Sequence, residues 1–247
     1  MRSIQTGLLC CMLLALVACG SPTDNSTAAP SVSASTPATV ASPPAAASAA
    51  ASTQAGASSA AAGGNDAAVG NDKYSAPPAM QIDPNKQYRA TIETTKGTMQ
   101  VELFPKEAPK AVNNFVFLAR ENFYRNVKFH RIIKGFMAQT GDPLGTGTGG
   151  PGYAFEIEKP TQPYKVGTLA MANTGQPNSN GSQFFIVNGN DVGLAPDYTI
   201  FGQVTEGLDV VQKISDTPVQ MAAGGIDSVP SQPTEDVRIT NITITEQ

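Results

Sequence analysis

Residues 129–139 read Phe-His-Arg-Ile-Ile-Lys-Gly-Phe-Met-Ala-Gln, and residues 180–187 read Asn-Gly-Ser-Gln-Phe-Phe-Ile-Val. Both stretches are rich in β-branched and aromatic residues, which favour strands. Lys134-Gly135 divides the first stretch, which therefore predicts a strand, a turn and a second strand. These strands carry one arginine, Arg131, and one glutamine, Gln139, among bulky apolar side chains.

The neighbouring segments predict further strands and two helices. Residues 88–95 alternate and are followed, after Lys96-Gly97, by a second alternating run, which indicates a hairpin. Pro109 suits the first turn of a helix, and apolar residues at helical spacing predict an amphipathic helix over 109–122. A second helix is predicted near 207–214, and further strands at 128–134, 136–140, 153–157, 167–172, 183–188, 199–204 and 237–245. Many strands with two distant helices indicate a closed antiparallel barrel capped at its ends.

The order of these segments, and above all the two quoted stretches, resembles the cyclophilin family of peptidyl-prolyl cis-trans isomerases over about residues 85–246. The resemblance implies a mainly β fold, a closed eight-stranded antiparallel β-barrel capped by two α-helices. It also implies an enzyme that accelerates X–Pro bond rotation in exported or unfolded polypeptides and so assists folding. Proline-containing polypeptides would be its partners. Rotation transfers no proton, so neither a metal nor another cofactor is expected.

Arg131 is the central candidate for catalysis. Alternation along the strand predicts that Phe129, Arg131 and Ile133 share one face, with His130 on the other as a buried, hydrogen-bonded residue. From the residues alone, such an arginine could also pack its stem on apolar neighbours while its head reaches solvent. The resemblance assigns it to catalysis, together with Gln139. A guanidinium N–H directed at the proline nitrogen would stabilise the twisted amide more than the planar one.

The resemblance assigns a second set of residues to substrate binding. It implies an apolar pocket for the proline ring, made by Phe136, Met137, Phe185, Leu194 and Phe201. It also implies contacts to the substrate backbone, or a neighbouring pocket, at Ala172, Asn173, Gln183 and Tyr198. Aromatic residues in strands are more often core residues, so the residues alone do not separate pocket from core.

The chain departs from the family pattern in three places. Tyr198 stands where many members have histidine, and its hydroxyl could still bind the substrate carbonyl. Gly193 stands where many eukaryotic members have the tryptophan that helps to hold cyclosporin, so weak cyclosporin binding is expected. The loop at 174–178 is one residue longer than usual, which could alter the preference for residues before proline.

The first 19 residues resemble the start of a bacterial lipoprotein. Arg2 precedes an apolar run from Leu8 to Val17 that is too short to span a bilayer as a permanent helix. Small residues then lead into Cys19, as in a lipobox. We expect residues 1–18 to be a signal peptide and lipidated Cys19 to anchor the protein to a cell-envelope membrane, facing the periplasm or the exterior. An ordinary secretory signal with an incidental cysteine is the alternative.

Residues 19–80 have the composition of a linker. Positions 20–72 contain no Lys or Arg and consist mostly of Ala, Ser, Thr, Pro and Gly. Such a segment cannot bury enough apolar surface to offset the entropy of ordering. We therefore expect a disordered linker over 19–80 and the isomerase domain over 81–247. A fragment that begins near Met80 is expected to melt at the same temperature as the longer chain.

Charge and composition exclude several other functions. Arg2 and three aspartates are the only charged residues before Lys73, which leaves 15 of the 16 basic and 17 of the 20 acidic residues after that point. No basic stripe is visible, so nucleic acid is not an expected partner. His130 is the only histidine, which excludes a histidine-cluster metal site.

A possible dinucleotide motif is also set aside. Residues 145–150 match G-x-G-x-x-G, but Pro151 and a strand follow them instead of the helix that such a site needs.

A monomer is expected. A proline-peptide-binding or holdase module with little turnover, or a purely structural lipoprotein, remain alternatives to the enzyme, and Arg131 with its polar neighbours favours the enzyme.

Overall fold

The computed structural model describes residues 71–224 and 227–247. The predicted signal peptide, Cys19 and most of the predicted linker therefore lie outside the described residues. Within the described ranges, no helix is both long enough and apolar enough to cross a membrane.

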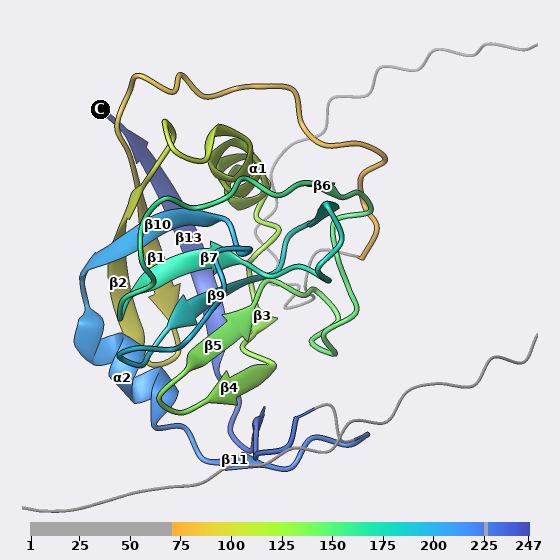
Figure 1. Ribbon diagram of the computed structural model, residues 1–247, viewed down its shortest axis with the longest axis vertical. Helices are drawn as coiled ribbons and strands as arrows, with labels where there is room; N and C mark the ends of the chain where they lie inside the picture. Colours follow the sequence, from red (N-terminus) through yellow and green to blue (C-terminus); the bar gives the residue numbers. More distant parts are fainter. Residues whose placement is uncertain (1–70, 225–226) are drawn as a thin grey trace, which may run out of the picture. The chain divides into compact units, whose positions relative to one another are not determined.

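The described chain is mainly β, with two helices (Figure 1). The helices are α1 (Pro109–Arg120) and α2 (Leu208–Ser215). The strands are β1 (Tyr88–Thr94), β2 (Gly97–Leu103), β3 (Val127–Lys128), β4 (Arg131–Ile133), β5 (Met137–Thr140), β6 (Phe155–Glu156), β7 (Thr168–Met171), β8 (Asn178–Asn180), β9 (Phe184–Val187), β10 (Ile200–Glu206), β11 (Val219–Gln220), β12 (Gln232–Pro233) and β13 (Arg238–Glu246).

Nine of these strands form one curled antiparallel sheet in the order β3-β13-β1-β2-β10-β7-β9-β5-β4. Its two end strands, β3 and β4, are separated in the chain only by Phe129 and His130. The strand order thus returns to the segment where it began, and β3 with β4 counts as one strand of an eight-stranded barrel. The predicted mainly β, cyclophilin-like barrel with two helices is confirmed.

The interior is filled by apolar side chains from the strands and from α1. Phe115 of α1 packs against Phe184 and Phe201, with ring centroids 5.6 and 5.1 Å away. Pro109 begins α1, where its missing N–H is not needed, and most of the helix's apolar side chains are buried. α2 packs against β2, β4 and β5 and covers another part of the sheet.

The predicted alternation holds within β4, where Arg131 and Ile133 lie on the outer side and Ile132 points inward, but it does not extend back to Phe129. Phe129 and Ile132 both belong to the barrel interior, whereas Ile133 packs on a second cluster. This outer apolar cluster consists of Met137, Ala170, Phe185, Val187 and Ile200. Phe129 and Arg131 therefore do not share a face. The alternation breaks because the chain changes its pairing partner between β3, which pairs with β13, and β4, which pairs with β5.

Residues 71–80, which their composition assigned to the linker, pack against the domain. The Tyr74 ring lies in an edge-to-face arrangement 5.1 Å from Phe117, and its backbone N–H donates to Pro151 O at 2.9 Å. The Asn113 side-chain amide donates to Ala79 O at 3.0 Å. The ordered domain therefore begins before residue 81, because one aromatic side chain and several backbone hydrogen bonds hold this segment in place.

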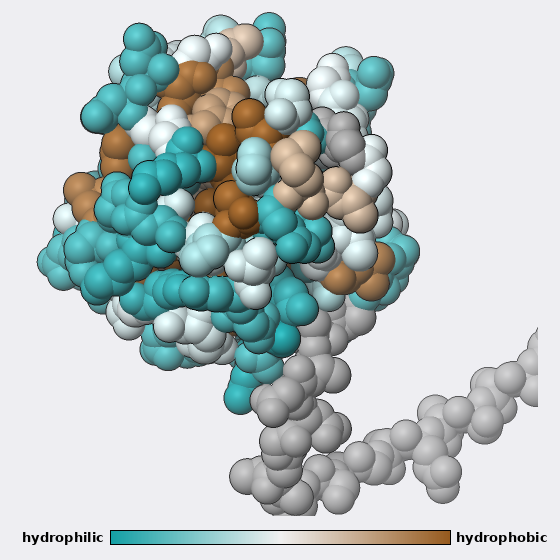
Figure 2. Space-filling model, turned by 90° about the horizontal axis from the view of Figure 1, so that it is seen from below, coloured by the Kyte–Doolittle hydropathy of each residue, from teal (hydrophilic) through white to brown (hydrophobic). Residues whose placement is uncertain are grey.

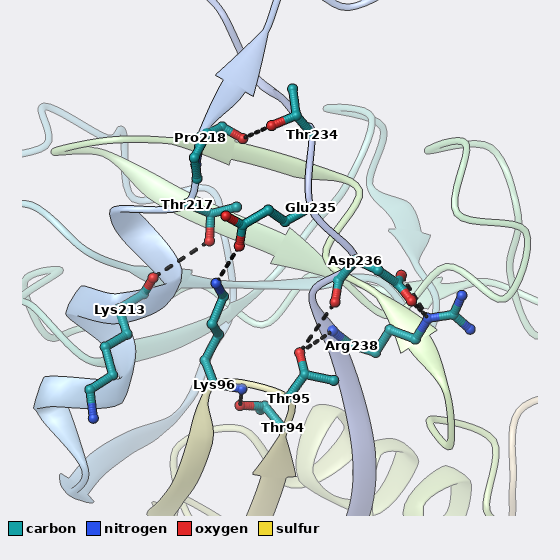
Figure 3. A network of polar contacts seen from close by, with 10 residues as sticks. All are labelled: Thr94, Thr95, Lys96, Lys213, Thr217, Pro218, Thr234, Glu235, Asp236 and Arg238. Carbon is teal, nitrogen blue, oxygen red and sulfur yellow. Dashed lines mark hydrogen bonds and ion pairs between the residues drawn. The ribbon is translucent and has the colours of Figure 1, made fainter.

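A polar network joins the β1–β2 turn, the end of α2 and the segment before β13 (Figure 3). Lys96 Nζ lies 2.5 Å from Glu235 Oε2, and the Thr234 hydroxyl donates to Pro218 O at 3.1 Å. Next to these contacts, β11 and β12 pair as a short antiparallel hairpin. The network and the pairing fix the stem from which the loop between β11 and β12 extends.

Candidate active site

Three neighbouring strands place the central side chains in one row. Arg131 on β4 pairs with Gln139 on β5, which pairs with Phe185 on β9. Directly opposite residues of an antiparallel pair point to the same side of the sheet, so these three side chains emerge together on one face. The row lies outside the barrel interior, where Phe185 belongs to the outer apolar cluster.

A cavity of about 250 Å³ opens over this row. Its walls are formed by nine residues that the sequence predicted for the site: Arg131, Phe136, Met137, Gln139, Ala172, Asn173, Phe185, Leu194 and Tyr198. Met137 and Phe185 form the apolar floor of this cavity, and only 2% and 4% of their respective surfaces are exposed to solvent. The Tyr198 ring stands edge-on to Phe185 at 5.5 Å. Figure 2 shows hydrophobic surface, bordered by hydrophilic side chains, on the end of the molecule that faces downward in Figure 1.

A second cavity, of about 240 Å³, adjoins the first. Gln139, Ala172 and Asn173 line both cavities, and Gln183 lines only the second. The Ala172 amide already donates to Gln183 O at 2.9 Å, so it cannot also bind a substrate carbonyl. A peptide that occupied both cavities would cross over Gln139, Ala172 and Asn173.

A chain of hydrogen bonds orients the two glutamines. The Gln183 amide N–H donates to Gly147 O at 3.0 Å and Gly149 O at 2.9 Å, so its oxygen must face Gln139. Gln139 Nε2 donates to that oxygen at 2.9 Å, which turns Gln139 Oε1 toward Arg131 Nη1, 3.4 Å away. The Gly-rich loop that matches a dinucleotide motif thus leads into no helix and holds Gln183 in place.

Asp227 is a site residue that the sequence did not predict. Its carboxylate lies 2.8 Å from Arg131 Nε and 2.6 Å from Nη2, a two-point ion pair. The Arg131 hydrogen bonds, together with one from Ser231, lower the pKa of Asp227 although partial burial opposes this. Asp227 is 96 positions from Arg131 in a Gly- and Ala-rich loop, where no local pattern points to the contact.

Phe201 was predicted to line the proline pocket, but its ring is fully buried in the barrel interior, because β10 turns this side chain inward to meet Phe115. Tyr164, which was not predicted, holds the backbone of the pocket residue Tyr198. Its hydroxyl lies 2.9 Å from Tyr198 O and accepts a hydrogen bond from Tyr198 N at 3.1 Å.

His130 departs from the expected hydrogen-bonded histidine. Both of its ring nitrogens are buried, and neither has a hydrogen-bond partner among the described residues. Its ring lies against Gly147 of the Gly-rich loop. Desolvation lowers the pKa of His130, with the nearby Arg131 acting in the same direction and Asp142 opposing it. A neutral imidazole fits this place, since burial penalises the charged form.

Comparison with known proteins identifies the family. Residues 89–244 match the family model described as cyclophilin type peptidyl-prolyl cis-trans isomerase/CLD. The chain belongs to the cyclophilin family. The chicken peptidyl-prolyl cis-trans isomerase-like 3 is 43% identical over 159 residues, which cover 62% of this chain and 94% of the relative. Residues 89–244 therefore form a cyclophilin-type isomerase domain.

Other cyclophilin relatives agree in the domain and differ in length. A Helicobacter pylori peptidyl-prolyl cis-trans isomerase is 49% identical over 129 residues, 51% of this chain and 78% of that protein. The mouse peptidylprolyl isomerase domain and WD repeat-containing protein 1 is 45% identical over 163 residues, and the chain spans only 24% of its length. A crystal structure of a Cryptosporidium parvum cyclophilin type isomerase aligns with a TM-score of 0.58 at 34% identity, covering 66% of this chain and 99% of the other.

Proposed function

We propose that the protein catalyses X–Pro bond rotation in exported or unfolded polypeptides, with Arg131 as the catalytic residue. The observation that carries the proposal is the row of Arg131, Gln139 and Phe185, which sets a charged donor beside a nearly closed apolar floor. A proline ring needs such a floor. The same Cryptosporidium parvum protein has also been crystallised in the presence of the dipeptide Ala-Pro, which supports a proline-containing ligand for the domain.

The origin of the barrier to rotation explains the role of the arginine. An X–Pro amide is conjugated, and twisting it costs about 18–20 kcal/mol. In the twisted state the proline nitrogen regains a lone pair that can accept a hydrogen bond. Arg131 Nη1 faces the cavity between Gln139 and Met137, where its N–H can be donated to that nitrogen. This bond exists only in the twisted state, so it lowers the barrier without tightening the planar substrate.

The neighbouring groups hold the substrate while the bond rotates. The apolar floor of Met137 and Phe185 immobilises the proline ring. The residues before proline would lie along Ala172 and Asn173 toward the second cavity. With the ring fixed on one side of the bond and the preceding chain on the other, rotation is confined to the bond itself.

Exchange NMR on an Ala-Pro peptide tests this proposal. Arg131→Ala should lower kcat by about 10²–10³, the usual loss for one preorganised donor, while peptide affinity changes far less. Arg89→Ala is the matched control, because Arg89 is an exposed arginine on β1. A wild-type protein that binds the peptide without catalysing exchange would favour the holdase alternative instead.

We further propose that Cys19 is lipidated and anchors the protein to a cell-envelope membrane. The support is the sequence Leu16-Val17-Ala18-Cys19 after a short apolar run. Lipid anchoring would keep the isomerase near newly exported chains, whose X–Pro bonds rotate in about 10–100 s without catalysis. Cys19→Ser should abolish acylation and leave the chain uncleaved or released. Intact-mass measurement decides the matter, and an unacylated mature N-terminus at another residue would refute the proposal.

A further inference from the structure

We infer that Asp227 is a positioning residue of the isomerase site, which holds the Arg131 guanidinium so that Nη1 faces the substrate. This inference rests on the proposed function. The two carboxylate oxygens bind Nε and Nη2 at 2.8 and 2.6 Å. A two-point contact of this kind fixes the plane of the guanidinium as well as its position.

The ion pair engages only one edge of the guanidinium. Nη1 points to the opposite side, 3.4 Å from Gln139 Oε1 and 3.7 Å from Met137 Sδ. Both of these residues line the first cavity. Asp227 thus binds Nε and Nη2 and leaves Nη1 on the side of the cavity.

Asp227 is itself fixed relative to the strand that carries Arg131. Its side chain is only 9% exposed, against 30% for Arg131. Ser231, at the base of the same loop, donates its N–H to Gln220 O at 3.0 Å. Ser231 O accepts a hydrogen bond at 2.8 Å from the N–H of Ile132, the residue after Arg131. Backbone bonds therefore tie the Asp227 loop to β4 next to the arginine.

The position of Asp227 favours an indirect role over substrate binding. It lines neither of the two cavities of the site. Its low pKa keeps the carboxylate ionised at neutral pH, so it has no proton to donate to a substrate carbonyl. What remains is an effect through Arg131. An arginine without such a partner samples many rotamers, and only a fraction of them would present Nη1 to the pocket.

The test compares Asp227→Asn, Asp227→Glu and the control Asp209→Asn. Asp209 pairs with Lys213 on the exposed surface of α2, so the control removes the same charge away from the site. In the full chain, Asp227→Asn should lower kcat about tenfold with little change in KM, as expected for a misaligned group. Asp227→Glu keeps the charge and should recover most of that loss, while Asp209→Asn should behave as wild type.

An NMR measurement separates positioning from a general loss of structure. The Arg131 Nε–Hε signal, assigned by its absence in Arg131→Lys, should be protected from solvent exchange in the wild type and lose this protection in Asp227→Asn. The inference is overturned by an unchanged or raised kcat in Asp227→Asn, or by a rise in KM alone. It is also overturned if Asp227→Asn lowers the melting temperature as well as kcat and Asp227→Glu restores neither. Failure of the proposed function would appear differently, as an inactive wild type.

Discussion

The segment from residue 71 to residue 80 gives the clearest test of how the domain is built. We expect Tyr74→Ala to lower the melting temperature, because the Tyr74 ring packs against Phe117, Phe123 and Tyr153. A fully buried aromatic residue typically costs about 3–5 kcal/mol when it is truncated to alanine. Tyr74 is only partly buried, so we expect about half of that, near 2 kcal/mol.

That loss translates into a measurable temperature shift. For a domain of this size, 1 kcal/mol shifts the melting temperature by about 2–4 °C, so Tyr74→Ala should lower it by about 4–8 °C. A fragment that begins at Met80 lacks residues 71–79, including Tyr74, and its melting temperature should fall by a similar amount. The composition alone had predicted equal melting temperatures for this fragment and the longer chain, and the packing of Tyr74 now predicts a lower one for the fragment. Differential scanning calorimetry on chains that begin at residue 20, residue 71 and residue 80 measures the shift.

Gly152 provides an independent check that residues 71–80 pack against the domain. A Cβ added to Gly152 would lie 2.2 Å from Tyr74 O, and the residue has a φ of +100° that disfavours alanine in any context. Gly152→Ala should therefore destabilise the long chain more than the fragment that begins at Met80, since only the long chain contains the clash. Equal melting temperatures for the residue-71 and residue-80 chains, with equal effects of Gly152→Ala in both, would refute the packing of this segment.

Two further predictions concern the site and its surroundings. Phe185→Ala should weaken peptide binding and lower the unfolding free energy by about 3–5 kcal/mol, because its ring is nearly closed off from solvent; a stability loss with unchanged peptide affinity would make Phe185 a core residue instead. The pKa of His130 should lie below the ordinary histidine value of 6.5 because desolvation lowers it, and the C2-proton NMR signal of the only histidine reports this directly. Its contribution to stability should be fully present above pH 6.5 and decline as the pH falls toward the folded-state pKa, and His130→Gln should remove that decline in urea unfolding.

Local patterns predicted most of the fold. The β1–β2 hairpin follows from alternation around Lys96-Gly97, and α1 follows from Pro109 and helical spacing. These signals lie within a few residues of one another, so they survive in a single sequence. The packing of residues 71–80 on the domain was not predicted, because Tyr74 is a single aromatic residue in a Ser-, Ala- and Pro-rich background.

The site was less accessible to sequence reasoning. Arg131, Gln139 and Phe185 were identified by resemblance, and their residues alone did not separate pocket from core. Phe185 and Phe201 are both aromatic strand residues, yet one points out of the barrel and the other points in. That difference depends on how β9 and β10 sit in the closed sheet, which no single strand encodes. The Asp227–Arg131 contact depends on loop placement across 96 positions.

The structure divides the site into a rigid row and three supporting loops. β4, β5 and β9 fix Arg131, Gln139 and Phe185 through backbone pairing. The Gly-rich loop holds Gln183, the loop between β9 and β10 carries Tyr198, and the β11–β12 loop supplies Asp227. Because barrel strands tolerate little change while loops tolerate more, substitutions in the first two loops should alter peptide preference, and those at Asp227 should alter the rate. The chemistry therefore depends on one loop as well as on the strands.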